Sequence, residues 1–252
     1  MWNSILLMLV NRWYVFVFLV AYLSIASLHW GSSRTLKLLF LGYFIAWASE
    51  AASIRWGFPY GMYFYHYDQM AGEPFLLGVP VWDSLSYVFL SFAGYMMALF
   101  IRTRWDRVTP ITKLQASWWT VVLGAFFTMV LDIVIDPIAH LGAQWFLGNI
   151  YHYPPGGLYF DVPLSNFAGW FLVALVILSV FRLTDRLEGV PENPKTIILG
   201  IGLFWGIYLF NIGVTFMIGA WKLGLTSLGW GFFLFLLALP RKRQGNLQDL
   251  TP

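Results

Sequence analysis

The sequence predicts an all-α, polytopic membrane helix bundle with about seven transmembrane helices. Of its 252 residues, 59% are hydrophobic and only 11% are charged, and the mean hydropathy is +0.68. A water-soluble fold of this composition would lack enough polar residues to cover its surface. Several apolar runs are also long enough to cross ~30 Å of hydrocarbon. We therefore expect residues 1–252 to form a single integral membrane domain.

Seven apolar runs, flanked by charged residues, glycine or proline, define the expected spans. In chain order they are residues 13–30, 36–54, 84–101, 115–135, 165–182, 197–217 and 221–239. Residues 1–10 are apolar too, but Asn11 and Arg12 follow them without a small-residue cleavage motif. We interpret this segment as a lead-in to the first span rather than a signal peptide. Cysteine is absent, which excludes disulfides and thiolate chemistry.

The positive charges predict the orientation of these spans. Seven spans place twelve basic residues on one side: Arg34, Lys37, Arg102, Arg104, Arg107, Lys113, Arg182, Arg186, Lys195, Arg241, Lys242 and Arg243. The other side carries only Arg12, Arg55 and Lys222. Because cytoplasmic loops are rich in Lys and Arg, we expect the N-terminus outside and the C-terminus in the cytoplasm, with the chain in the cell's inner membrane. The net charge of +3 then reflects membrane anchoring rather than a nucleic-acid partner.

The two long outer connections, residues 55–80 and 137–164, differ from the basic loops. Both are rich in Gly and Pro and crowded with aromatic side chains. We expect them to fold back over the bundle as a lid. A short echo between GMYF at 61–64 and GLYF at 157–160 suggests that two similar helix–loop–helix units face each other.

Carboxyl groups gather on the same outer side, where acids at membrane depth are costly and usually functional. Asp132 and Asp136 are four residues apart, so they share one helix face. Two carboxylates this close should not both ionise easily, and we expect one of them to hold a proton.

The remaining acids are placed by the same spans. Glu50 lies about a turn from the outer end of the second span, where pairing with Arg55 is an alternative to a catalytic role. Asp83 begins the third span, where an acid also complements the helix dipole. Asp68 and Glu73 lie in the middle of a loop and are expected to be solvated.

A protonated carboxylic acid beside a carboxylate, under a roof of aromatic rings, suits protonation of an electron-rich carbon–carbon double bond. Ring faces would stabilise the resulting carbocation, and the partner carboxylate would steer a water or remove a proton. No cofactor would be needed. The sequence contains no Gly-rich phosphate loop, GxSxG elbow, HExxH motif or dinucleotide fingerprint.

Four ordered segments after Glu50 carry a family resemblance: GFPYGMY at 57–63, LGVP at 77–80, LDIVIDP at 131–137 and PLSNFAGW at 163–170. Together they resemble the CruF-type carotenoid biosynthesis family, whose members include carotenoid 1,2-hydratases and bisanhydrobacterioruberin hydratases. The resemblance implies hydration of the end of an acyclic carotenoid through a tertiary cation that water captures. Asp161 departs from the family pattern, which has a small residue there, and this leaves the substrate's identity open.

On this basis we predict Asp132 and Asp136 as the catalytic acid and its partner, with Glu50 and Asp83 as secondary acids or water-positioning groups. The predicted substrate-binding residues are Tyr60, Tyr63, Tyr159 and Trp170 as rings, Asn166 as an orienting hydrogen-bond group, and Asn211. We expect no metal and no cofactor. The expected partners are an acyclic carotenoid, water and the lipid bilayer.

Three alternatives stay open at this stage. A membrane terpene or carotenoid cyclase would use the same protonation and differ only in what captures the cation. Asp132-xxx-Asp136 also resembles half of the aspartate-rich signature of Mg²⁺-dependent prenyltransferases. A transporter or pigment-binding membrane protein could use the carboxylates for proton coupling. The oligomeric state is not predicted.

Overall fold

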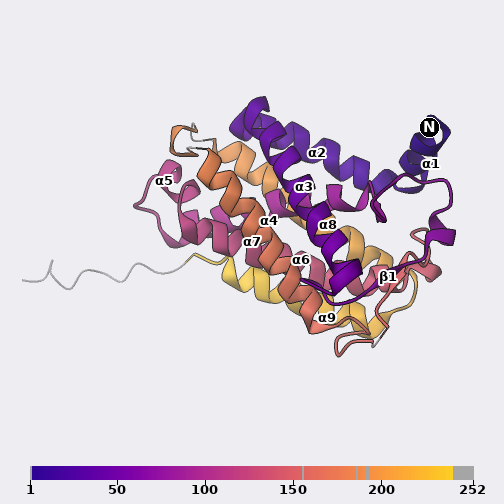
Figure 1. The fold of residues 1–252 in the computed structure, drawn as a ribbon. Coiled ribbons are helices and arrows are strands. Elements are labelled where there is room, and N and C mark those ends of the chain that lie inside the picture. The colour runs from indigo at the N-terminus through magenta and orange to yellow at the C-terminus, as the bar shows by residue number, and fades with distance from the viewer. Residues whose placement is uncertain (1, 155, 186, 191–192, 241–252) are drawn as a thin grey trace, which may run out of the picture.

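The computed structural model describes residues 2–154, 156–185, 187–190 and 193–240. Within these ranges, helices run back and forth between the two ends of one bundle (Figure 1). The helices are α1 Trp2–Asn11, α2 Trp13–Trp30, α3 Ser32–Trp56, α4 Asp83–Trp105, α5 Ile111–Gln115, α6 Trp118–His140, α7 Leu164–Thr184, α8 Pro194–Met217 and α9 Trp221–Leu237. The strands are β1 Phe64–Tyr65, β2 Phe75–Leu76, β3 Val79–Pro80 and β4 Tyr151–His152. Single 3₁₀ turns occur at η1 Tyr67–Met70, η2 Gly142–Gln144 and η3 Leu187–Gly189.

The predicted all-α, polytopic membrane fold is confirmed. Among the described residues, 6 helices are long and apolar enough to cross a membrane, namely α2, α3, α4, α6, α7 and α8. The seventh expected span is α9, an apolar helix of 17 residues. The segment before the first span is a separate helix, α1, because the chain bends at Arg12 before α2 begins.

The boundaries of α6 differ from the predicted span 115–135. The helix begins after Ser117, whose side chain accepts a hydrogen bond from the Trp119 backbone amide over 3.2 Å. It continues through Pro137 to His140. Asp136 therefore lies within the helix rather than at the start of a loop, and this keeps it on the same face as Asp132.

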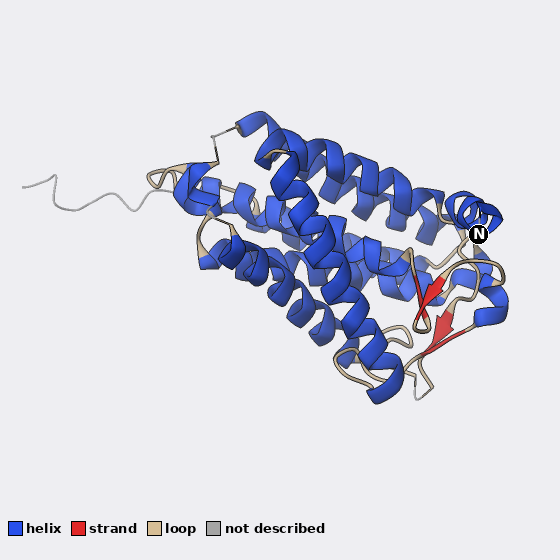
Figure 2. Cartoon of the chain, turned by 45° about the horizontal axis from the view of Figure 1, so that its top comes forward, coloured by secondary structure: helices blue, strands red, loops and turns tan. Residues whose placement is uncertain are grey.

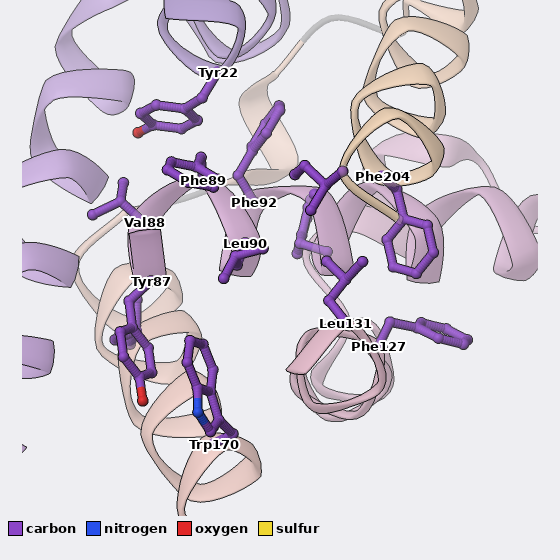
Figure 3. Packing of buried hydrophobic residues seen from close by; sticks show 14 of the residues in the cluster. Tyr22, Tyr87, Val88, Phe89, Leu90, Phe92, Phe127, Leu131, Trp170 and Phe204 are labelled. Carbon is purple, nitrogen blue, oxygen red and sulfur yellow. The ribbon is translucent and has the colours of Figure 1, made fainter. Parts of the chain in front are cut away.

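Helix α4 forms the centre of the bundle and packs against α2, α3, α6 and α8. In its most apolar window 83% of the residues are buried, against 28% for α2 and α3, and every residue from 87 to 99 is buried. Figure 3 shows side chains of α4 beside Tyr22 of α2, Leu131 of α6 and Phe204 of α8. This central position makes α4 the helix against which the others are placed.

The crossing of α4 and α6 depends on two glycines. A Cβ atom on Gly94 would lie 2.4 Å from Thr128 Oγ1 and 2.5 Å from the Gly124 carbonyl oxygen. A Cβ atom on Gly124 would lie 3.1 Å from the Cα of Tyr95. Small residues let helix backbones approach closely in membranes, and here they bring the α6 carboxyl groups near the start of α4.

Both long loops and the strands gather at one end of the bundle, beside the N-terminus (Figure 2). Strand β1 of the first loop pairs with β4 of the second in antiparallel register, with Tyr65 opposite Tyr151. Strands β2 and β3 form a hairpin whose turn residues, Leu77 and Gly78, both have positive φ. The strands that pair are not the echoed segments, since GLYF at 157–160 forms a turn closed between Tyr159 and Val162.

The N-terminal segment is tied to both loops by a buried ion pair. Arg12 and Glu73 are 2% and 6% exposed, and Arg12 Nη2 lies 3.0 Å from Glu73 Oε1. Arg12 also donates to the Leu147 carbonyl oxygen over 2.7 Å and lies over the Trp82 ring at 4.6 Å. The expectation that Glu73 is solvated is wrong, because a cation 61 positions away in the chain is buried against it. Asp68 is exposed, as expected.

The opposite end of the bundle carries basic residues that join α3 to α7. Arg34 and Lys37 of α3 hold Asp185, which follows α7, at 2.7 Å and 2.6 Å. Of the residues behind the predicted charge asymmetry, Arg186, Arg241, Lys242 and Arg243 lie outside the described residues. The direction in which the chain crosses the membrane stays a prediction.

Candidate active site

A cavity of about 140 Å³ lies inside the bundle, beneath the two long loops. Four carboxyl side chains line it: Glu50 of α3, Asp83 at the start of α4, and Asp132 and Asp136 of α6. This volume is close to the ~150 Å³ of cavities that hold one benzene-sized apolar molecule. It therefore suits a small branched hydrocarbon group together with little else.

Nine of the ten predicted site residues line this cavity. They are Glu50, Asp83, Asp132, Asp136, Tyr60, Tyr63, Asn166, Trp170 and Asn211. The tenth, Tyr159, does not line it; it lies in the turn before α7, where its ring packs on Phe160 and Phe167. Asn211 donates to the Ile207 carbonyl oxygen of its own helix over 2.9 Å, rather than to another helix.

The two α6 carboxyl groups share one donor from α7. Asn166 Nδ2 donates to Asp132 Oδ2 over 2.8 Å and to Asp136 Oδ2 over 3.0 Å. Asn166 is placed there because α7 begins at Leu164, directly after the second loop, and its first turn faces α6. A side-chain amide nitrogen carries two hydrogens, so both bonds can exist together.

The two acids differ in their remaining partners. Asp136 also accepts hydrogen bonds from the hydroxyl groups of Tyr151 and Tyr153. Asp132 Oδ1, in contrast, is buried and has no hydrogen-bond partner among the described residues. An ionised carboxylate is an acceptor only, which suits Asp136 with its three donors, whereas a protonated carboxyl group can offer a hydrogen to a ligand, which suits Asp132.

A second pair of acids occupies the α3 and α4 side of the cavity. Ser84 donates to Glu50 Oε2 over 2.6 Å, and Tyr65 donates to Asp83 Oδ2 over 2.6 Å. Arg55, considered as a partner for Glu50, instead donates to the carbonyl oxygens of Ala51 and Leu77. Each acid of this pair therefore has one neutral hydroxyl donor, and its other side faces the cavity.

Aromatic rings form the walls between the acids. Tyr87 of α4 and Trp170 of α7 are stacked with ring centroids 3.7 Å apart and planes 9° from parallel (Figure 3). The ring centroids of Tyr60 and Tyr87 are 5.9 Å apart, and the Tyr60 hydroxyl oxygen is 2.7 Å from Ser49 Oγ. These faces are rich in π-electron density and lie where a cation formed in the cavity would meet them.

Tyrosines from the loops form the roof. Tyr63 makes edge contacts with the rings of Tyr65, Tyr151 and Tyr153, with centroids 5.3 to 5.9 Å apart. Burial, and then the nearby Glu50 and Asp83, raise the pKa of Tyr63 well above its ordinary value. Burial and the nearby carboxyl group of Asp136 do the same for the pKa of Tyr151 and Tyr153. The roof thus remains a layer of neutral phenols that donate hydrogen bonds.

Sequence reasoning missed several of these groups. Tyr65, Tyr151 and Tyr153 are not singled out among the predicted loop aromatics, although Tyr63-x-Tyr65 and Tyr151-x-Tyr153 share a spacing of two. In a strand this spacing puts both side chains on one face, and the β1–β4 pairing turns that face inward. Phe64, between the first two tyrosines, is 47% exposed on the other face. No comparable pattern marks Ser84 or Tyr87, which read as core residues.

Within the described ranges, no three His, Cys, Asp or Glu side chains lie close enough together to hold a metal ion. The groups that converge on Asp136 are hydrogen-bond donors, which suit an anion rather than a cation.

Comparison with known proteins gives a family match and one similar protein. The sequence model of a family described as carotenoid biosynthesis protein matches residues 6–235. The chain is similar to the bisanhydrobacterioruberin hydratase of Haloarcula japonica, with 29% identity over an alignment of 169 residues that covers 64% of this chain and 52% of that protein. The match thus spans about half of the length of that relative. No solved structure matches the chain.

Proposed function

This chain belongs to the carotenoid biosynthesis protein family, and from that premise we propose that it hydrates the terminal double bond of an acyclic carotenoid end group. The named relative is a hydratase, which supports this class of reaction. The observation that carries the proposal is the unequal acid pair. Among the described residues, Asp132 Oδ1 is buried beside the cavity without a hydrogen-bond partner, while Asp136 next to it accepts three hydrogen bonds.

In the first step, the carboxylic acid of Asp132 gives its proton to the less substituted carbon of the terminal isopropylidene group. The acid's O–H bond breaks, a C–H bond forms from the π electrons, and positive charge develops on the tertiary carbon. The stacked rings of Tyr87 and Trp170 and the ring of Tyr60 lie around the cavity in which this charge appears. A desolvated cation over an aromatic face gains about 2 kcal/mol or more.

In the second step, a water molecule adds to the tertiary carbon and loses a proton to the carboxylate of Asp132. A C–O bond forms, the acid is regenerated, and the sum is one water added across the double bond. Glu50 and Asp83 are suited to hold that water, because both line the cavity and each has only one described hydroxyl donor. No cofactor enters this scheme.

The test is to express the chain in cells that accumulate lycopene and to analyse the pigments by mass. We expect the wild-type chain to add one water per modified end and Asp132→Asn to form product ~10²- to 10⁴-fold more slowly, the range for loss of a general acid. Asp68→Asn is the matched control, because Asp68 is an exposed acid of the first loop.

Each alternative gives a different result in the same experiment. An isomer of unchanged mass would indicate a cyclase. Equal hydration by wild type and Asp132→Asn, at equal membrane levels, would remove Asp132 from the mechanism. Unchanged pigment chemistry with an altered pigment location would favour transport.

A further inference from the structure

The cavity is much smaller than an acyclic carotenoid, the substrate proposed for it. Its volume of about 140 Å³ accommodates a benzene-sized group, whereas the polyene of an acyclic carotenoid continues far beyond the end group. The polyene must therefore extend out of the cavity on one side. This inference rests on the proposed function, because it takes an acyclic carotenoid as the ligand.

Two sides of the cavity are closed by contacts that cannot open easily. Above it, the Arg12–Glu73 ion pair and the paired strands β1 and β4 join both loops. Below it, α4 and α6 approach with Gly94 near Gly124, where even a Cβ atom has no room. A chain of conjugated carbons could pass neither place without separating backbone from backbone.

The side between α2, α8 and the second loop is built differently. Six aromatic side chains pack together on this side, beside Val15, Leu147 and Ile207 of the cavity lining. We call them the aromatic cluster: Trp13, Tyr14, Phe18, Trp145, Phe146 and Phe210. Tyr14 and Phe210 are stacked at 5.9 Å and 19°, and Phe18 meets Phe210 at 5.7 Å. Side chains can rotate away from such contacts while the helices stay in place.

Members of the aromatic cluster face both the cavity and the outside. Tyr14, Phe18, Trp145 and Phe210 line the cavity. Trp13 and Phe146 are 48% and 47% exposed on the outer surface of the bundle. Trp13 contacts Phe146 at 5.9 Å and Phe210 at 6.4 Å, so a continuous path of ring faces leads from the cavity to the surface.

We infer that the aromatic cluster is the lateral passage of the active site, through which the polyene extends into the bilayer while its end group lies at Asp132. The path opens beside Trp13, the first residue of α2, a helix long and apolar enough to span the membrane, so the polyene would leave at the end of that span and continue along it into the bilayer. Flat ring faces match a flat conjugated chain along its length. The four carboxyl groups line the cavity beyond the rings, where the terminal double bond would lie.

The absence of native cysteine makes a direct test possible. Phe210→Cys places a single thiol in the passage, and its rate of labelling by a maleimide is measured in detergent with and without lycopene. Phe40→Cys is the matched control, because Phe40 is a phenylalanine of α3 that is 58% exposed and does not line the cavity. Lycopene at about ten times its dissociation constant should slow labelling of Phe210→Cys by about tenfold and leave Phe40→Cys unchanged.

A second variant keeps the test decisive if Phe210→Cys does not fold. Phe146→Cys lies at the outer mouth of the passage, where the side chain is 47% exposed, so this substitution removes less buried surface than Phe210→Cys. Equal labelling of the passage and control thiols in the presence of lycopene would overturn the inference and leave the rings as an interfacial aromatic belt.

The outcome is separable from that of the proposed reaction. Protection of the Phe210→Cys or Phe146→Cys thiol without any hydration by the wild-type chain would refute the hydratase and retain the passage. Hydration by the wild-type chain without protection of either thiol would retain the hydratase and refute the passage.

Discussion

Asn166 donates hydrogen bonds to both acids of α6 and so fixes the position of one carboxyl group relative to the other. Its Nδ2 atom is 2.8 Å from Asp132 Oδ2 and 3.0 Å from Asp136 Oδ2. The residue is 2% exposed, so water cannot easily replace these bonds. One neutral amide thus holds two carboxyl groups in a fixed relation without adding charge.

Asn166→Leu should lower the rate of carotenoid hydration by roughly ten- to a hundredfold, because a hydrogen bond to a charged group contributes about 1.5 to 3 kcal/mol. Leucine has a similar size, so packing changes little. The measurement is product formed per unit of membrane protein. Asn149→Leu, at an exposed position of the second loop, is the control, and equal rates for the two variants would contradict the role of Asn166.

Some residues of the site are predictable from the sequence and others are not. Asp132 and Asp136 follow from helical spacing alone, since residues four apart share a face. Tyr151 and Tyr153 do not, because their role depends on pairing with a strand about 86 residues earlier, which no local pattern specifies. Glu73 was placed wrongly for the same reason: only the folded chain brings Arg12 to it.

At the scale of helices, the close crossing of α4 and α6 positions the acids. Gly94→Ala should destabilise the protein by about 1 to 3 kcal/mol, the usual cost of overpacking, because its Cβ would lie 2.5 Å from the Gly124 carbonyl oxygen. Thermal unfolding in detergent measures this. Gly202→Ala in α8 is the matched control, since a Cβ there meets open space and alanine favours helix by up to about 1 kcal/mol. Equal stability of the two variants would show that the crossing tolerates a side chain.

The ion pair between α1–α2 and the first loop gives a second prediction at this scale. Glu73→Gln should cost about 3 to 5 kcal/mol, because it leaves Arg12 charged and buried without its partner. Arg12→Met with Glu73→Leu should recover part of that loss, and only part, because the Leu147 carbonyl oxygen also loses its donor. Unfolding of the single and double variants in detergent measures both the stability lost in Glu73→Gln and the part recovered in the double variant. A double variant less stable than Glu73→Gln would contradict this account.

The whole molecule has one end with acids and tyrosines and another with basic residues. At the basic end, burial raises the pKa of Asp185, but its hydrogen bonds to Arg34 and Lys37 and their charges outweigh this and lower the pKa below its ordinary value. A carboxyl group with a depressed pKa in the folded state contributes stability that is present above its unfolded pKa and lost as pH falls through the folded pKa. The α3–α7 contact should therefore weaken below about pH 4.

The measurement for this contact is the midpoint of thermal unfolding in detergent as a function of pH. Asp185→Asn should lower the midpoint at neutral pH and reduce its fall under acid. A variant that keeps the full wild-type pH dependence would assign the acid sensitivity to other groups.

The fold class was predictable at this scale because composition and the lengths of the apolar runs indicate it, and the family because four ordered segments resemble it. Seven apolar runs predicted the helices, and the ordered segments between residues 50 and 170 predicted the carotenoid biosynthesis family, which the match over residues 6–235 confirms. The strands, the buried Arg12 and the closed turn around Tyr159 were not predictable, because each depends on contacts between segments far apart in the chain.

The pairing of β1 with β4 has a consequence for how this protein could fail. In the observed register Tyr65 is opposite Tyr151, and inward and outward side chains alternate along both strands. A slip of β4 by one residue would turn His152 toward the acids and remove both tyrosine donors, Tyr151 and Tyr153, from Asp136. A molecule with mispaired strands therefore loses both phenol donors at once rather than one of them. A preparation with half the normal activity would then be a mixture of correctly paired and mispaired molecules.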